Sequence, residues 1–92
     1  MARVLVVEDD PSIRYLLEVV LSADGHQVVQ AETAREALEY LRRETPDLIV
    51  LDVVMPGMDG LTLLGRIRAV RRVRVRTTSL GSVKTARPRS SS

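Results

Sequence analysis

The chain alternates short, continuous apolar runs with segments whose apolar residues recur every three or four positions, up to about residue 70. Continuous runs of this kind are typical of strands buried on both faces, whereas the wider spacing is typical of helices with one buried stripe. The expected strands are residues 3–7 ("RVLVV"), 26–31 ("HQVVQA") and 47–52 ("DLIVLD"), and the expected helices are residues 10–25, 33–43 and 60–70. Strands that alternate with such helices predict an α/β fold with a parallel sheet covered on both faces.

The expected helices begin at residues that suit helix termini. Asp10 is a good N-cap, and Pro11 suits the first position of the first helix. Thr33 and Glu36 form a capping box at the start of the second helix, and Asp59 can cap the third. The helix boundaries are therefore encoded locally.

The pattern changes after about residue 70. The segment "RRVRVRTTSLGSVKTARPRSSS" has no helical stripe, and arginine takes alternate positions of its one alternating run, which no central parallel strand could bury. Ser, Arg, Pro and Gly dominate its end, a composition typical of disorder. We therefore expect an incomplete sheet of about three strands and three helices in residues 2–70, followed by a disordered basic tail in residues 71–92. The third strand would then be an exposed edge through which chains could self-associate.

Charge is divided along the chain in the same way. All 12 acidic residues lie at or before Asp59 with five basic ones, whereas nine basic residues and no acidic one follow from Arg66 onward. The basic end lacks aromatic residues for base stacking, so nucleic-acid binding is not expected. No cysteine is present to form a disulfide or a thiolate metal site. With no signal peptide and no membrane span in the sequence, a cytoplasmic protein is expected.

Acidic residues stand at the ends of two expected strands. Glu8 and Asp9 follow the first strand, and Asp52 ends the third. Open parallel sheets bind ligands beyond the carboxyl ends of their strands, and right-handed crossovers can place the first strand beside the third. Three carboxylates would then converge and repel one another, which favours a divalent cation such as Mg²⁺. A carboxylate beside that cation is a candidate phosphoryl acceptor.

Three segments resemble the receiver domain of bacterial two-component response regulators: "VLVVEDDPSIR", "DGHQVVQAETAREALEYL" and "PDLIVLDVVMPGMDGLTLL", from about residue 2 to about residue 70. The resemblance implies a flavodoxin-like, doubly wound parallel sheet and a phosphorelay in which a sensor histidine kinase phosphorylates Asp52. It also implies a Mg²⁺ site made by Glu8, Asp9 and Asp52, with Asp9 the more direct ligand of the first two. Val54 would offer its backbone carbonyl to the same metal.

The rest of the chain departs from the family pattern. In a receiver, the fourth strand ends in a Thr or Ser that hydrogen-bonds the phosphoryl group, and the fifth ends in a Lys that pairs with it. Lys84 comes too early for that role, and no apolar strand leads to the hydroxyl residues near the expected position, which are Thr77, Thr78, Ser79 and Ser82. A frameshift or a truncation after about residue 70 would explain the loss. The alternative to a phosphorelay receiver is then a nonfunctional fragment, or a partner-binding fragment with a basic tail.

Two other kinds of protein also place an acid at the end of a strand. "LIVLD" is similar to the Walker B strand of nucleotide hydrolases, but the chain has no GxxxxGK[ST] phosphate loop. Phosphatases of the haloacid dehalogenase type have a second Asp two residues after the first, where this chain has Val54. We therefore expect the chain not to be an enzyme.

Overall fold

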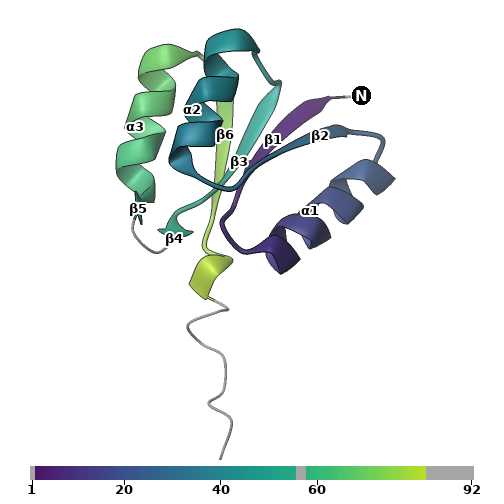
Figure 1. Cartoon of the computed structure of the whole chain (residues 1–92). Coiled ribbons are helices and arrows are strands. Elements are labelled where there is room, and N and C mark those ends of the chain that lie inside the picture. Colours follow the sequence, from purple (N-terminus) through teal and green to yellow (C-terminus); the bar gives the residue numbers. More distant parts are fainter. Residues whose placement is uncertain (1, 56–57, 83–92) are drawn as a thin grey trace, which may run out of the picture.

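The computed structural model describes residues 2–55 and 58–82. Its elements follow one another as β1 (Arg3–Val7), α1 (Pro11–Ala23), β2 (Gln27–Ala31), α2 (Ala34–Arg43), β3 (Leu48–Asp52), β4 (Val54–Met55), β5 (Met58–Asp59), α3 (Gly60–Val70) and β6 (Arg74–Thr78) (Figure 1). The three helices and the first three strands confirm the elements expected from the hydrophobic pattern. No helix in the described ranges has the length and apolar character needed to cross a membrane.

The main sheet has four parallel strands in the order β2-β1-β3-β6. β1 pairs with β2 on one side, with Val7 opposite Ala31, and with β3 on the other, with Val7 opposite Leu51. The strand order therefore reverses direction at β1, which places the ends of β1 and β3 side by side at the same edge. This arrangement is the flavodoxin-like, doubly wound sheet that the sequence predicted.

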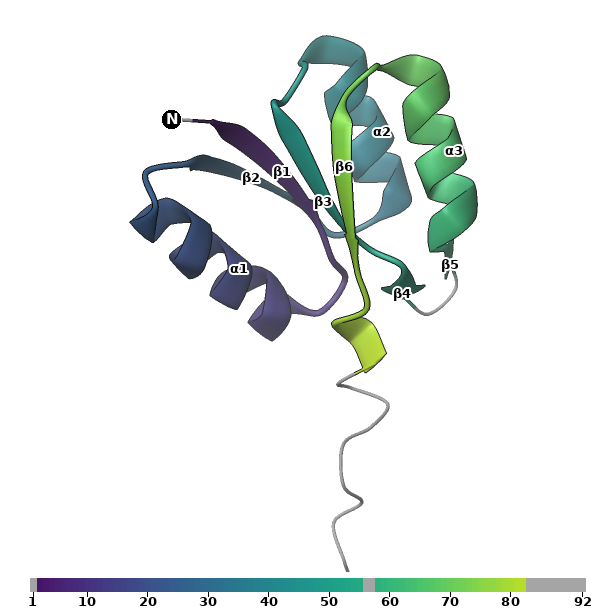
Figure 2. The same cartoon turned by 180° about the vertical axis from the view of Figure 1, so that it is seen from behind.

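The helices divide between the two faces of the sheet (Figures 1 and 2). α2 and α3 pack on the face that carries the main apolar core, which consists of Leu5, Val7, Ala31, Ala37, Leu41, Ile49, Leu51, Met55, Leu63 and Ile67. α1 contacts β1 and β2, and all 13 of its described residues stay at least partly exposed. The α1 face of the sheet is therefore covered less completely than the face under α2 and α3.

The local sequence signals at the helix starts are confirmed. The Asp10 side chain accepts hydrogen bonds from the backbone N–H groups of Ser12 and Ile13. Thr33 accepts a hydrogen bond from the Glu36 N–H group, and the Glu36 side chain accepts one from the Glu32 N–H group. The bonds to Asp10 and Thr33 satisfy N–H groups in the first turns of α1 and α2 that have no partner inside the helix, so both helices have a defined first residue. The Glu36 side chain bonds one residue before the N-cap position that a capping box uses.

β6 corrects the expectation that no strand follows residue 70. Residues Arg74–Thr78 pair in parallel with β3. Val73 and Val75 pack against the main core, while the alternate residues Arg74 and Arg76 are exposed. β6 is the outer strand of the described sheet, so only one of its faces needs to be apolar, and arginine is tolerated on the other. On this side of the sheet the outer strand is therefore β6, not β3. The end of the predicted tail, residues 83–92, lies outside the described residues.

Candidate metal and phosphoacceptor site

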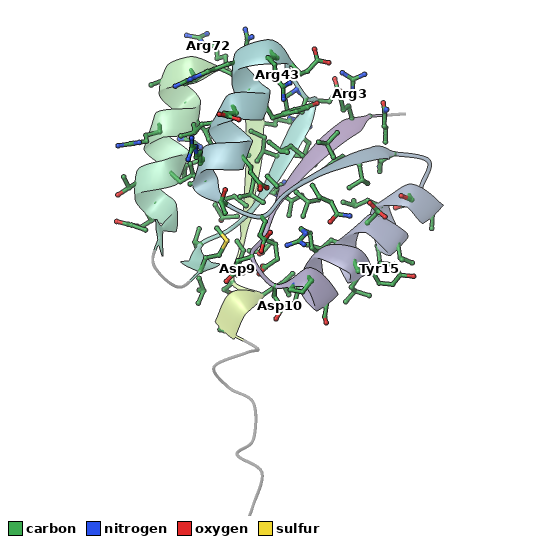
Figure 3. All side chains as sticks on the ribbon, in the orientation of Figure 1. Arg3, Asp9, Asp10, Tyr15, Arg43 and Arg72 are labelled. Atoms are coloured by element: carbon green, nitrogen blue, oxygen red, sulfur yellow. The ribbon has the colours of Figure 1, made fainter. Side chains whose placement is uncertain are left out.

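Three carboxylates converge at the carboxyl ends of β1 and β3. Glu8, Asp9 and Asp52 each offer one oxygen, and these oxygens lie within 4.8 Å of one another. Glu8 and Asp52 are almost completely buried, with exposed fractions of 0% and 2%, and Asp9 is half-buried. Figure 3 shows Asp9 beside the start of α1, at the same edge of the sheet as Asp10. The structure therefore brings together the three acidic residues that the sequence singled out.

Backbone groups hold two of these carboxylates in place. The Val54 N–H group donates a hydrogen bond to Asp52 Oδ1 at 2.9 Å, and the Asp10 N–H group donates one to Glu8 Oε1 at 2.9 Å. Arg14 donates hydrogen bonds to the carbonyl oxygens of Glu8 and Asp9, at 2.8 and 3.4 Å. The loop after β1 is thus tied to α1, and the loop after β3 is tied to Asp52 itself.

The second oxygen of Asp52 is buried without an ordinary donor. Asp52 Oδ2 receives no hydrogen bond from an N–H or hydroxyl group of the described residues. The group that can serve it is the carboxyl group of Glu8, when that group carries a proton. A buried carboxylate oxygen of this kind costs free energy unless a proton or a cation compensates its charge.

The pKa of Glu8 is raised because its carboxyl group is buried beside Asp52. Burial, and next the hydrogen bond with the Asp52 side chain, raise the pKa of Glu8 from 4.5 to about 8. Two neighbouring carboxylates cannot both ionise cheaply in a buried site, so Glu8 holds a proton near neutral pH. A divalent cation would replace that proton, and an all-oxygen donor set of carboxylates suits Mg²⁺. The residues present therefore fit the metal that the resemblance implied.

Val54 and Thr78 complete the surroundings of Asp52. The site that a Cβ atom on Gly81 would take lies against both Val54 O and Asp52 Oδ2, so the two oxygens face one small space. Thr78 is the residue opposite Asp52 in the β3–β6 pairing, and its hydroxyl group is buried with no hydrogen-bond partner among the described residues. Paired residues of parallel strands project to the same face of the sheet, so Thr78 lies on the Asp52 side.

The sequence had left the choice among four hydroxyl residues open because no strand was expected there. The Ser82 hydroxyl group donates a hydrogen bond to the Ser79 carbonyl at 2.6 Å, and Ser79 itself is exposed. Thr77 projects to the opposite face from Thr78, and Lys84 lies outside the described residues. The alternation "VRVRTT" was a weak signal for the strand, and only the pairing of that strand with β3 distinguishes Thr78 from Thr77.

Known proteins are similar to this chain in sequence and in fold. A family model described as the response regulator receiver domain matches residues 4–87. The transcriptional regulatory protein AfsQ1 of Streptomyces coelicolor is 47% identical over 68 residues, which make up 74% of this chain and 30% of AfsQ1. The chain thus spans less than a third of that relative.

Solved structures agree with the family match. The complex of the histidine kinase ThkA with the response regulator protein TrrA contains a chain that matches with a TM-score of 0.77 and 38% identity, over 84% of this chain and 67% of that one. TrrA from Thermotoga maritima in complex with Mg²⁺ and a beryllium fluoride matches with a TM-score of 0.75 and 34% identity, over 95% and 77% of the two chains.

The family match also extends beyond residue 70, where the resemblance was expected to end, and it includes β6. The same match includes all three acidic residues of the site. The chain therefore belongs to the receiver-domain family of two-component response regulators.

Proposed function

We propose that this chain accepts a phosphoryl group on Asp52 from the phosphohistidine of a sensor histidine kinase, with Mg²⁺ bound by Glu8, Asp9, Asp52 and the Val54 carbonyl. The observation that carries the proposal is the meeting of three carboxylate oxygens, from Glu8, Asp9 and Asp52, within 4.8 Å of one another. Asp52 also has a buried oxygen, Oδ2, with no N–H or hydroxyl donor among the described residues. The histidine kinase is inferred as the partner because TrrA, a similar chain, was solved in complex with the kinase ThkA. Since such kinases present their phosphohistidine in the cytoplasm, we expect the chain to act there.

The geometry suggests how the side chains divide the work. Asp52 Oδ1 is occupied by the Val54 N–H group, which leaves Oδ2 as the nucleophile. Oδ2 forms the new bond to phosphorus while the phosphorus–nitrogen bond to the kinase histidine breaks, and the departing nitrogen keeps the electron pair. The bound Mg²⁺ would neutralise the charge of the phosphoryl oxygens. The buried Thr78 hydroxyl group, on the same side of the sheet, would donate a hydrogen bond to one of those oxygens.

This chemistry makes the chain a phosphoryl acceptor that is modified once per cycle, not an enzyme that turns over a substrate. The experiment is incubation with acetyl phosphate and Mg²⁺, followed by intact mass measurement. We expect the mass of one added phosphoryl group in the unchanged protein and none in Asp52→Asn. Asp24→Asn is the matched control because Asp24 is exposed and lies at the far end of α1.

The outcome also distinguishes the proposal from its alternative. A folded protein that gains no mass with Mg²⁺ present, or an Asp52→Asn variant that gains as much as the unchanged protein, contradicts phosphoryl transfer to Asp52.

A partner-binding role without phosphorylation is the second candidate function. It is favoured by the apolar residues that α1 leaves exposed, which are Tyr15, Leu16, Val19 and Val20, with exposed fractions from 46% to 66%. Apolar side chains gathered on one helix are typical of an interaction surface. β6 adds an exposed strand edge through which a second copy could pair. This candidate requires no chemistry at Asp52, so the mass measurement separates it from the first.

A further inference from the structure

A short helical turn follows directly after β6 (Figure 2). The Ser82 N–H group donates a hydrogen bond to the Ser79 carbonyl at 2.9 Å, and the Ser82 hydroxyl group donates one to the same oxygen at 2.6 Å. Gly81 lies inside this turn and is buried, although the residues on either side of it are more exposed. We call residues 79–82 the closing turn.

Gly81 is packed against the two oxygens that the proposed chemistry uses. A Cβ atom at this position would overlap Val54 O, lie 2.9 Å from Val54 C and lie 2.7 Å from Asp52 Oδ2. Since a carbon–carbon bond is only about 1.5 Å long, the Gly81 Cα atom is itself in contact with the Val54 carbonyl. The closing turn therefore covers the acceptor oxygen and the backbone metal ligand together.

Space, and not backbone conformation, is the reason for a glycine here. Among the described glycines only Gly25 has a positive φ, of 85°, the region in which a side chain is strained. Gly81 adopts a conformation open to other residues, and only the contact with Val54 and Asp52 excludes them. Gly65, on α3, shows the contrast because a Cβ atom there would meet no described atom within 4 Å.

The closing turn must move before a cation and a phosphoryl group can both reach Asp52 Oδ2. Val54 is held by its hydrogen bond to Asp52 and by its pairing with Asp59 in the β4–β5 hairpin. The closing turn extends from the end of an outer strand, so it is the side that can yield at lower cost. We infer that Gly81 is the access-determining residue of the acidic site, and that its missing side chain allows the closing turn to cover Asp52 until the metal and the phosphodonor displace it.

This inference rests on the proposed function. It predicts that a substitution that destabilises the metal-free protein increases its affinity for Mg²⁺. Gly81→Ala cannot adopt the covered arrangement, so its metal-free form should be less stable and more often open. A ligand that binds only the open form has an apparent Kd equal to its intrinsic Kd divided by the open fraction. Gly81→Ala should therefore bind Mg²⁺ more tightly than the unchanged protein, by at least about threefold.

The experiment measures the Kd for Mg²⁺ by calorimetric titration, the initial rate of phosphorylation by acetyl phosphate at subsaturating Mg²⁺, and the melting temperature without metal. Gly81→Ala should show a lower melting temperature, a lower Kd and a faster initial rate. Gly65→Ala controls for the added methyl group, and Leu41→Ala controls for a general loss of stability in a core residue away from the site. Both controls should keep the Kd of the unchanged protein.

A second measurement does not depend on a variant that folds. Nitrogen-15 relaxation of the unchanged protein should show larger fast motions of the Gly81 and Ser82 amides when Mg²⁺ is added, because the metal displaces the closing turn. Folded Gly81→Ala with an equal or higher Kd, or amides that stay equally ordered with Mg²⁺ bound, overturns the inference while phosphorylation of Asp52 stands. Absence of both Mg²⁺ binding and phosphorylation in the unchanged protein and in Gly81→Ala overturns the proposed function and the inference together.

Discussion

Replacing Asp52 with asparagine should stabilise the metal-free protein at neutral and mildly alkaline pH. In the unchanged protein, burial and next the hydrogen bond with the Asp52 side chain raise the pKa of Glu8 from 4.5 to about 8. In Asp52→Asn the side-chain oxygen can still accept the Val54 N–H group, and the amide can donate a hydrogen bond to Glu8. The variant thus removes a like charge and adds a donor at the same place.

The sign and the size of the effect follow from proton binding. Between about pH 4.5 and about pH 8, Glu8 holds a proton in the folded state that it has lost in the unfolded state. The free energy of unfolding therefore falls as pH rises through this range and levels off above about pH 8. Each pKa unit corresponds to about 1.4 kcal/mol. Burial is the largest cause of the shift and persists in the variant, so we expect Asp52→Asn to recover only about 1–2 kcal/mol at pH 8.

Urea denaturation in the presence of a chelator, at several pH values from about 5 to 8.5, measures this difference. Subtracting the two curves of unfolding free energy against pH removes the contributions of titratable groups that both proteins share. Asp24→Asn should follow the unchanged protein throughout. Adding Mg²⁺ at ten times its Kd should then narrow the difference, because the unchanged protein gains about 1.4 kcal/mol and the variant gains less. The reasoning is refuted if the unchanged protein does not lose stability between pH 5 and pH 8, or if Asp52→Asn is the less stable protein at pH 8 without metal.

Four further substitutions test other parts of the structure. Thr78→Val keeps the shape of a buried side chain whose hydroxyl group has no described partner; it should leave the urea midpoint without metal nearly unchanged and slow phosphorylation by acetyl phosphate. Asp10→Ala removes the N-cap of α1 and should lower the free energy of unfolding by about 1 kcal/mol in the same urea assay, whereas an unchanged value would contradict the capping role. Leu41→Ala opens a cavity in the main core and should cost about 2–5 kcal/mol, so a loss below 1 kcal/mol would show that the core is not packed as described. Val20→Lys places a charge on the exposed apolar side of α1 and should reduce any concentration-dependent association seen by sedimentation; equal association of both proteins would exclude that surface.

Local sequence information was sufficient for most elements up to residue 70. Continuous apolar runs and capping residues such as Asp10 and Thr33 act within a few positions along the chain, so they predict strands and helix starts without knowledge of the rest. The acidic residues at the strand ends could also be identified from the sequence, because a carboxylate directly after an apolar run does not contribute to an apolar core. Their convergence needed one more step, the handedness rule that places β1 between β2 and β3.

The part of the site that follows residue 70, which consists of Thr78 and Gly81, could be found only from the tertiary structure. "VRVRTT" does not predict a buried strand by itself, since arginine alternates with valine. Only its pairing with β3 places Val73 and Val75 against the main core and so stabilises the strand. That pairing brings Thr78 opposite Asp52 and carries Gly81 back over Val54. The sequence by itself thus determined which carboxylates stand at strand ends, because that depends on neighbours in the chain. Only the tertiary structure decided what covers them, because contact between residues about thirty positions apart depends on strand order and register, which no local pattern encodes.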